Sequence, residues 1–422
     1  MGINLFRMYK NSGQQREIKD VFYLILLQGL NYVAPLLVLP YLMIKLGAEK
    51  FGYIGFSLSV CQYLMLIVDF GFNLSGTKRI ALVQDNQDKL NLIFSSTFYA
   101  KLGLLLLSFI FLTILAMIPQ FAIYRSTMFV LFISVIGNTF LFVFLFQGLG
   151  KIRVVSVINT ISKLSILPLT FWLVKGPADY LTAAFIQSMV SIMAAVLSLL
   201  VIFHNKWVTL VRFNITAIST EIREGLPLFL SFAATSIYTA CFVVILGLTA
   251  SPTEVGCYSA TDRIMRAFLC LSLTPILQSF YPKISRMGKE NQAEALSLVH
   301  KLFIFVICAM LILGICLFSC SFWIINLLGI GYKGTENLFR IMAFIPIFVG
   351  IGGVIGQLKL LALGNSNDKK HFESAYFIAC VVAILGVSLL SALFKAEGTA
   401  IALLATEITV ATVMVMFDLK RA

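Results

Sequence analysis

The chain has 422 residues, of which 59% are hydrophobic and only 12% are charged, and its formal net charge is +13. A soluble globular protein carries about twice that fraction of charged residues, so the composition excludes an ordinary soluble domain. The apolar residues form long blocks, and many blocks exceed the ~20 residues that cross a bilayer as a helix. We therefore predict an all-α, polytopic membrane protein, because the ten-residue alternation of a transmembrane barrel is not visible.

Twelve apolar blocks follow one another along the chain, each near the length that a bilayer requires. The first begins after a polar, basic stretch. It is too long for the core of a signal peptide, and no small-residue cleavage site follows it. The predicted spans are 21–44, 52–75, 92–118, 127–149, 154–174, 179–203, 226–249, 255–281, 301–328, 338–363, 373–394 and 398–418.

The loops between the predicted spans alternate between a basic set and a less basic set. The set that includes both termini holds twenty lysines and arginines, and the other set holds seven. Because cytoplasmic loops are enriched in these residues, we expect both termini in the cytoplasm. The positive net charge is thus mainly a signal of topology. No basic patch interleaved with aromatic residues indicates binding of nucleic acid.

A weak internal repeat divides the chain near its middle. Pairing each residue with the one 204 positions later sets residues 49–53 (EKFGY) against residues 253–257 (TEVGC). With six spans in each half, the halves have the same orientation and are related by an axis along the membrane normal. We predict two six-helix lobes, residues 1–210 and 211–422, around a central cavity. This is the architecture of an alternating-access transporter.

Several charged side chains lie deep within the predicted spans, where each costs roughly 2.5–3.5 kcal/mol on insertion scales. Four are cations and two are carboxylates, and charges inside a membrane usually face a watered cavity or the interior of a bundle. The positive excess indicates a cavity for an anion, since arginine holds phosphate through its planar fork and lysine acts as a point charge. The six residues are Lys101, Lys163, Asp262, Arg263, Arg266 and Glu407.

The deep cations also have a structural interpretation. Lys101 and Lys163 can reach the interface with their charged ends while their stems stay in lipid. Asp262 and Arg266 are four residues apart on one helix, so they share a face and can form a structural ion pair. The sequence leaves both interpretations open.

Two carboxylates are candidates for ion coupling. Asp69 lies near the cytoplasmic end of the second predicted span, where it could bind a coupling ion or meet the substrate. The alternative is a cap, or an ion pair with Lys78 or Arg79. Glu407 lies at mid-depth in the last predicted span. It is a candidate ion carrier, because a carboxylate in apolar surroundings takes up a proton more readily.

Metal and nucleotide sites are not indicated. The eight cysteines and three histidines show no metal-ligand spacing. No G-x-x-x-x-G-K-[ST] loop occurs, so the sequence gives no sign of ATP hydrolysis. We predict that the protein uses neither a metal nor a cofactor.

Six stretches between the first and the last predicted span form a specific combination: QGLNYVAPLLVLPYLMIKLGAEKFGYIGF, LMLIVDFGFNLSGTKRIA, FLFQGLGKIRVVSVIN, SPTEVGCYSATDRI, TPILQSFYPKIS and LLATE. Together they resemble the polysaccharide transporter family, and the resemblance covers essentially the whole chain. Within that family the sequence is similar to O-antigen flippases of the Wzx type. These proteins belong to the multidrug/oligosaccharidyl-lipid/polysaccharide (MOP) exporter superfamily.

The resemblance implies a transporter, not an enzyme, with twelve helices in two lobes. It implies movement of an undecaprenyl-pyrophosphate-linked O-antigen repeat unit from the cytoplasmic to the periplasmic leaflet of a bacterial inner membrane. It further implies contact with membrane lipid, coupling to a proton or sodium gradient, and work alongside other O-antigen assembly proteins.

Three other functions were weighed against this one. A drug or cation exporter of the same superfamily should have an acidic or apolar cavity. An O-antigen polymerase should show a large periplasmic loop. A channel should show a ring of like residues. The sequence shows none of these features, and the exporter is the closest alternative because it shares the same architecture.

Overall fold

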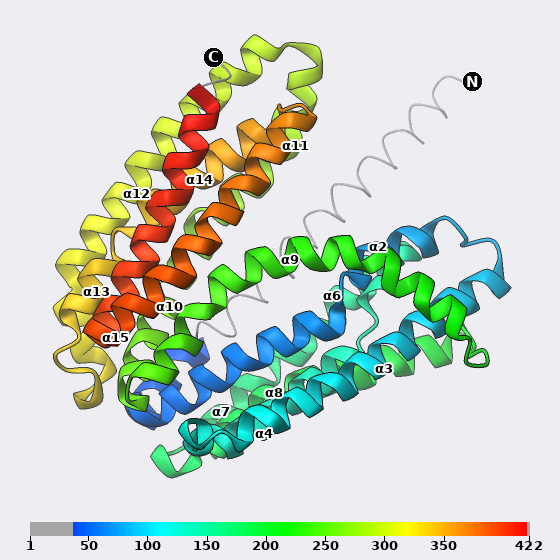
Figure 1. The fold of residues 1–422 in the computed structure, drawn as a ribbon, viewed down its shortest axis with the longest axis horizontal. Coiled ribbons are helices and arrows are strands. Elements are labelled where there is room, and N and C mark those ends of the chain that lie inside the picture. The colour runs from blue at the N-terminus through cyan, green and yellow to red at the C-terminus, as the bar shows by residue number, and fades with distance from the viewer. Residues whose placement is uncertain (1–36, 420–422) are drawn as a thin grey trace, which may run out of the picture.

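The computed structural model describes residues 37–419, and the elements in that range are helices (Figure 1). Most of the predicted first span, 21–44, therefore lies outside the described residues. In chain order the elements are a helical stretch Leu37–Ala81 that ends in α2 (Phe72–Ala81), α3 (Gln87–Met117), η1 (Pro119–Tyr124), α4 (Arg125–Thr139), α5 (Val143–Gly148), α6 (Ile152–Leu164), α7 (Ile166–Leu173), η2 (Pro177–Asp179), α8 (Tyr180–His204), α9 (Ile215–Thr249), α10 (Pro252–Ser272), α11 (Thr274–Glu290), α12 (Gln292–Leu328), η3 (Ile330–Tyr332), α13 (Glu336–Met342), α14 (Ile345–Gly352), the π-helix η4 (Gly353–Leu361) and α15 (Ser366–Leu419).

The apolar blocks predict the positions of the helices well, because a backbone in lipid must satisfy its hydrogen bonds within the segment. For example, the predicted span 179–203 agrees with α8 to within one residue at each end. The last two predicted spans both fall within α15, which is interrupted at Lys395 (φ 50°, ψ −124°). Nine helical stretches among residues 37–419 are long and apolar enough to cross a membrane. The chain is thus a polytopic, all-helical membrane protein, as predicted.

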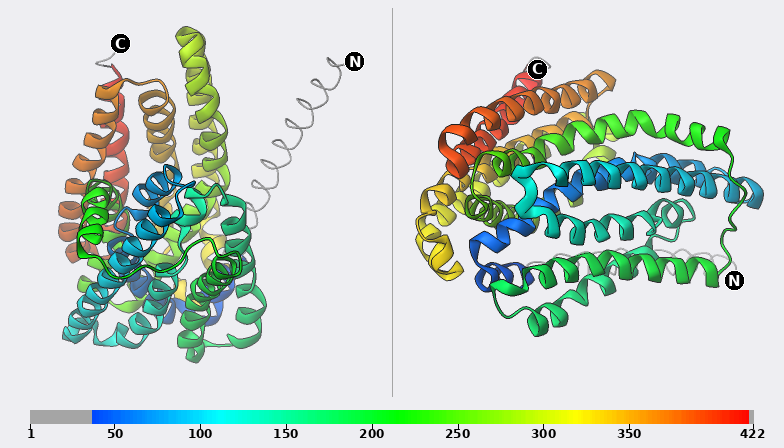
Figure 2. Two further views of the ribbon diagram at one scale, coloured as in Figure 1. Left: turned by 90° about the vertical axis from the view of Figure 1, so that its right-hand side faces the viewer. Right: turned by 60° about the horizontal axis from the view of Figure 1, so that its bottom comes forward.

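Two groups of helices lie close together at one end and diverge at the other (Figure 1). One group contains α3, α4 and α6–α8, and the other contains α10–α15; Figure 2 shows the same two groups from other directions. α9 packs against α3 of the first group, against the adjacent α2, and against α15 of the second group. It therefore connects the two groups. The division into lobes of residues 1–210 and 211–422 stays a prediction.

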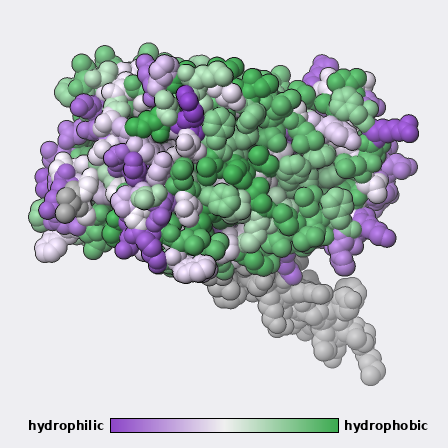
Figure 3. All heavy atoms as spheres, turned by 90° about the horizontal axis from the view of Figure 1, so that it is seen from below, coloured by the Kyte–Doolittle hydropathy of each residue, from purple (hydrophilic) through white to green (hydrophobic). Residues whose placement is uncertain are grey.

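The outer surface is apolar over a wide area. Figure 3 shows a broad hydrophobic region on one face, with hydrophilic residues at the left and at the right-hand edge. Large apolar side chains such as Leu107, Trp172 and Trp323 are more than half exposed. A contiguous apolar surface of this kind is unusual in a soluble monomer, and it fits contact with lipid.

The two halves of the sequence cross at a pair of glycines. A Cβ atom at Gly52 would lie 2.0 Å from the carbonyl oxygen of Pro252, and one at Gly256 would lie 1.8 Å from the carbonyl oxygen of Ala48. Both pairs, 52 with 256 and 48 with 252, differ by the 204 residues of the internal repeat. Small residues let helix backbones approach closely in membranes, so only glycine fits at these two positions.

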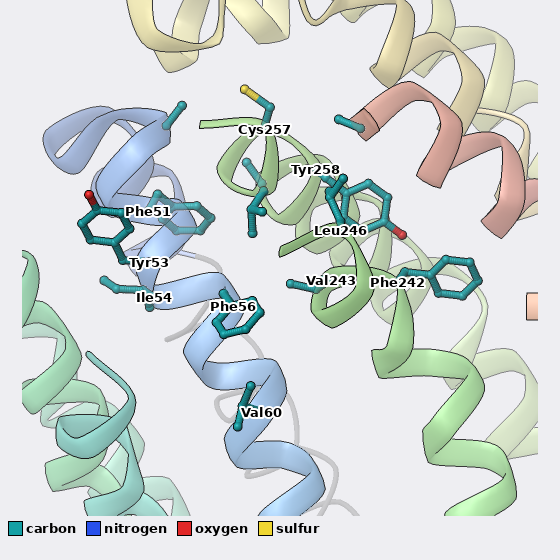
Figure 4. Packing of buried hydrophobic residues seen from close by; sticks show 14 of the residues in the cluster. Phe51, Tyr53, Ile54, Phe56, Val60, Phe242, Val243, Leu246, Cys257 and Tyr258 are labelled. Atoms are coloured by element: carbon teal, nitrogen blue, oxygen red, sulfur yellow. The ribbon is translucent and has the colours of Figure 1, made fainter. Parts of the chain in front are cut away.

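Bulky side chains surround the glycine crossing and seal it. Phe51 and Phe56 of the stretch Leu37–Ala81 are fully buried, as is Leu246 of α9. Tyr258 of α10 lies in the same hydrophobic cluster (Figure 4). Phe56 also stacks on Tyr124, with ring centroids 4.1 Å apart. This end of the molecule, at the loops predicted to be extracytoplasmic, is therefore tightly packed.

Candidate functional site

A cavity of about 590 Å³ begins about one helical turn beyond the glycine crossing. We call it the central cavity. Its wall comes from the stretch Leu37–Ala81, from α9 and from α10. Gly55 and Ser259, another pair 204 residues apart, both line it. The remaining polar lining residues are Ser59, Gln62, Thr239, Asp262, Arg263 and Arg266.

Two predicted site residues form an ion pair inside the central cavity. The Nε of Arg266 donates to Oδ2 of Asp262 at 2.8 Å, as their i, i+4 spacing on α10 predicted. Arg266 also donates from Nη2 to the carbonyl oxygen of Thr239 on α9, at 3.5 Å. Its side chain is 48% exposed, so the guanidinium remains accessible from the cavity. Asp262 and Arg266 therefore bring one compensated pair of charges to the site.

A second cavity of about 230 Å³ adjoins the central cavity, and we call it the side cavity. The two cavities share Leu39 and Arg263 as lining residues. The guanidinium of Arg263 lies over the ring of Phe51, 5.4 Å from its centroid, which fixes its orientation. Lys163 lines the side cavity, so the fold brings this predicted cation of α6 to the same space as Arg263 of α10. The other lining residues are Val38, Leu42, Ile166, Gln187, Val190 and Ser191.

Lys101 and Asp69 are joined to each other instead of to the cavities. The Nζ of Lys101 donates to Oδ1 of Asp69 at 2.9 Å, and the Nδ2 of Asn138 donates to Oδ2 of Asp69 at 3.1 Å. The Lys101 side chain is only 1% exposed and lines neither cavity. The helices on which these residues lie are interrupted nearby, at Phe70 and at Phe142, where φ is positive. A substrate-binding role for Lys101 thus stays a prediction without support from the geometry.

One of the alternative partners expected for Asp69 pairs with a different carboxylate. Arg79 forms an ion pair with Glu221 of α9, whose side chain is 1% exposed. Burial raises the pKa of the Glu221 carboxyl from 4.5 to about 7, although the charge of Arg79 opposes that rise. This pair could not be predicted from the sequence, because its members are 142 residues apart. It fastens the beginning of α9 to α2.

Glu407, the other coupling candidate, is buried in the second half of the chain. Glu407 is 8% exposed. Its charge interacts with Tyr258 of α10 and with Tyr376, which precedes it in α15. It lines neither cavity. Among residues 37–419, no group of three or more His, Cys, Asp or Glu side chains could hold a metal ion.

Several polar lining residues were missed by the sequence reasoning, among them Gln62, Gln187 and Ser191. The last two are four residues apart on α8, so they share a helix face. An amide and a hydroxyl at that spacing in an apolar block are the signal that could have identified them.

The fold defines the class of protein. The chain superposes on the inward-facing structure of a multidrug resistance MATE family transporter of the MOP superfamily with a TM-score of 0.73. The sequence identity is 12%, and the match covers 94% of this chain and 98% of the other. It also superposes on the lipid II flippase MurJ in an inward closed conformation with a TM-score of 0.71. There the identity is 15%, and coverage is 94% and 87%. The chain thus shares its fold with these two membrane transport proteins.

Sequence similarity then identifies the family. Residues 18–288 match the family described as "Polysaccharide biosynthesis protein". A "Putative O-antigen transporter" of Escherichia coli K12 is 33% identical over 404 residues, which are 94% of this chain and 96% of the relative. One of Shigella dysenteriae with the same name is 31% identical over 410 residues, which are 95% and 99%. The chain belongs to this polysaccharide biosynthesis family. The proteins it matches are named as transporters or flippases, not as enzymes, in agreement with the predicted class.

Proposed function

We propose that this protein moves an undecaprenyl-pyrophosphate-linked O-antigen repeat unit from the cytoplasmic to the periplasmic leaflet of a bacterial inner membrane. In this proposal twelve transmembrane helices form two six-helix lobes, residues 1–210 and 211–422, with both termini in the cytoplasm. The lobes rock about the central cavity. Support comes from full-length similarity to proteins named as O-antigen transporters and from the fold shared with a lipid II flippase.

The observation that carries this proposal is the charge of the two cavities. Their lining contains three cations, Lys163, Arg263 and Arg266, and one carboxylate, Asp262, which is already paired with Arg266. A pyrophosphate that crosses the middle of a bilayer loses the water that stabilises its charge. Fixed cationic donors replace that water, and guanidinium groups suit phosphate oxygens geometrically. Arg263 and Arg266 therefore serve as anion ligands, and Asp262 holds Arg266 in place.

The charge of the cavities disfavours the alternative, an exporter of cationic drugs. Such a cavity would attract its substrate with an excess of carboxylates. Among the described residues, one acidic side chain lines the cavities, and this residue, Asp262, is neutralised by its ion pair with Arg266. The positive charge of the site favours an anionic substrate over a cationic one.

Coupling to a proton or sodium gradient is part of the proposal, with Glu407 as the carrier. Its carboxylate is buried among apolar helices and close to two tyrosines. Asp69 is the weaker candidate, because Lys101 already neutralises it. If the Glu407→Gln variant keeps gradient-dependent transport at the wild-type rate, Glu407 is not the carrier.

The test is complementation of a bacterium that lacks its own O-antigen flippase but has the matching glycan genes. Surface polysaccharide is measured with wild type, Arg266→Ala, Arg266→Lys and Arg263→Ala at equal membrane levels. Lys175→Gln, a neutralised cation outside both cavities, is the matched control. We expect wild type and the control to restore surface glycan and both alanine variants to fail. Arg266→Lys separates the effect of charge from that of the guanidinium fork. Normal glycan with both alanine variants would refute the cationic site.

A further inference from the structure

The side cavity differs from the central cavity in charge. In the central cavity the charge of Arg266 is balanced by Asp262, whose Oδ2 lies 2.8 Å from Nε of Arg266. Among residues 37–419, the side cavity is lined by two cations, Lys163 and Arg263, and by no carboxylate. No carboxylate among the described residues forms an ion pair with Lys163. An anion in the side cavity would therefore meet two cations that form no ion pair with a described carboxylate.

The neutral lining of the side cavity suits a sugar ring. Gln187 and Ser191 lie on one face of α8 and present an amide and a hydroxyl, which can exchange hydrogen bonds with sugar hydroxyls. The same cavity is lined by Val38 and Leu42 of the stretch Leu37–Ala81 and by Ile166 of α7, which offer apolar surface to the C–H face of a ring. Cations, neutral polar groups and an apolar wall thus occur within one small space.

The size of the side cavity limits what can enter it. Its volume of about 230 Å³ is below the roughly 300–1,000 Å³ of common ligand pockets. It therefore suits one ring and an attached anionic group, not a whole repeat unit. The adjoining central cavity, at about 590 Å³, has room for further sugars, and Ser59, Gln62, Thr239 and Ser259 give it neutral polar groups.

We propose that the side cavity is the subsite for one monosaccharide that bears an anionic group, with Lys163 and Arg263 on the anion and Gln187 and Ser191 on the sugar hydroxyls. Two sources share this chemistry: the sugar attached to the pyrophosphate of the carrier, and an acidic sugar within the repeat unit. Arg263, which lines both cavities, marks where the bound chain passes into the central cavity. This inference rests on the proposed function and assigns Gln187 and Ser191 as determinants of sugar specificity.

Binding measurements on the purified full chain test this assignment. Three probes are compared: farnesyl pyrophosphate, farnesyl pyrophosphate carrying N-acetylglucosamine, and farnesyl pyrophosphate carrying glucuronic acid. The variants are Lys163→Gln, Lys163→Arg and Gln187→Leu. Lys175→Gln serves as the matched control, because it removes a lysine charge outside both cavities. Each variant is used only where its melting temperature equals that of wild type, and Gln187→Asn replaces Gln187→Leu if the latter does not fold.

We expect wild type to bind the sugar-bearing probes more tightly than farnesyl pyrophosphate. Gln187→Leu should weaken binding of the sugar-bearing probes about fivefold or more and leave binding of farnesyl pyrophosphate unchanged. Lys163→Gln should weaken binding of the probes that carry the anion recognised by Lys163 about tenfold or more, and Lys163→Arg should restore their affinity. A loss with all three probes identifies the anion as the pyrophosphate, and a loss only with the glucuronic acid probe identifies it as a sugar carboxylate.

The outcomes separate this inference from the function on which it rests. If Lys163→Gln and Gln187→Leu bind all three probes like wild type, the subsite assignment is overturned, while wild-type binding still supports the proposed function. If wild type itself binds none of the probes and restores no surface glycan, the proposed function fails, and the subsite assignment fails with it.

Discussion

Alternating access requires the glycine crossing to open, and a disulfide across the same end of the molecule should prevent this. A Cβ atom at Gly331 in η3 would lie 3.7 Å from Cβ of Ala48. Disulfide-bonded cysteines have Cβ atoms roughly 3.5–4.5 Å apart. The double variant Ala48→Cys/Gly331→Cys should therefore cross-link with little distortion. It would join the two halves of the chain next to the Gly52–Gly256 contact.

The effect of the cross-link on transport should be all-or-none for each molecule. A covalent bond between the halves cannot stretch, so transport should fall to the fraction of protein that stays uncross-linked, and a reductant should restore it. The Sγ of Cys257 lies 4.0 Å from the carbonyl oxygen of Gly331. Both the test and the control are therefore made in a Cys257→Ala background, which prevents a competing disulfide.

The matched control joins two helices within one half of the chain. A Cβ atom at Gly386 would lie 3.6 Å from Cβ of Ala402, so Gly386→Cys/Ala402→Cys should cross-link the two parts of α15 equally well. Surface glycan is measured with a membrane-permeant oxidant and then with a reductant, and the linked peptides are quantified by mass spectrometry. We expect loss of transport only for the pair at 48 and 331. Full transport by protein that is completely cross-linked there would refute the idea that this end opens.

Three further predictions concern ion pairs and packing. Lys101→Met leaves the carboxylate of Asp69 without its cation. It should lower the free energy of unfolding by about 3 kcal/mol, the lower end for a broken buried ion pair, because the Asp69 side chain is 25% exposed. A double-mutant cycle with Asp69→Asn, followed by thermal melting, should show coupling, and purely additive effects would contradict the pairing. The raised pKa of Glu221 favours the native state below pH 4.5, and that advantage is lost as the pH rises towards about 7. Wild type should therefore lose about 3 kcal/mol relative to Glu221→Gln between those pH values, and parallel stability curves would disprove it. Gly256→Ala places a methyl group against a backbone oxygen and should cost about 1–3 kcal/mol. The same change at Gly103, where a Cβ atom would meet nothing within 4 Å, should cost far less; equal melting temperatures for the two variants would contradict the close contact.

The sequence by itself determined where helices form. Lipid offers no hydrogen-bond partners, so each apolar block must satisfy its own backbone, and the blocks and helices coincide. It also determined local pairs. Asp262 and Arg266 are four residues apart on one helix, so their contact at 2.8 Å follows from helix geometry alone. The weak repeat was likewise readable, since the Gly52–Gly256 contact keeps its offset of 204 residues.

Only the tertiary structure decided which helices meet. The sequence offered Lys78 and Arg79 as partners of Asp69, because they are near in the chain. Packing of α3 against the stretch Leu37–Ala81 instead brought Lys101 to it, and left Arg79 to Glu221 of α9. Such pairs depend on helix rotation and crossing, which hydrophobic periodicity does not encode when most faces of a helix are apolar.

The same reason governs the candidate site. Lys163 and Arg263 were visible as deep cations, but whether each faced lipid, the protein interior or a cavity depended on the rotation of α6 and α10. In the folded protein both residues line the side cavity, together with Gln187 and Ser191 of α8. The sequence therefore determined that buried positive charge exists. The packing of helices distant in sequence decided that this charge is shared around a space that a ligand can enter.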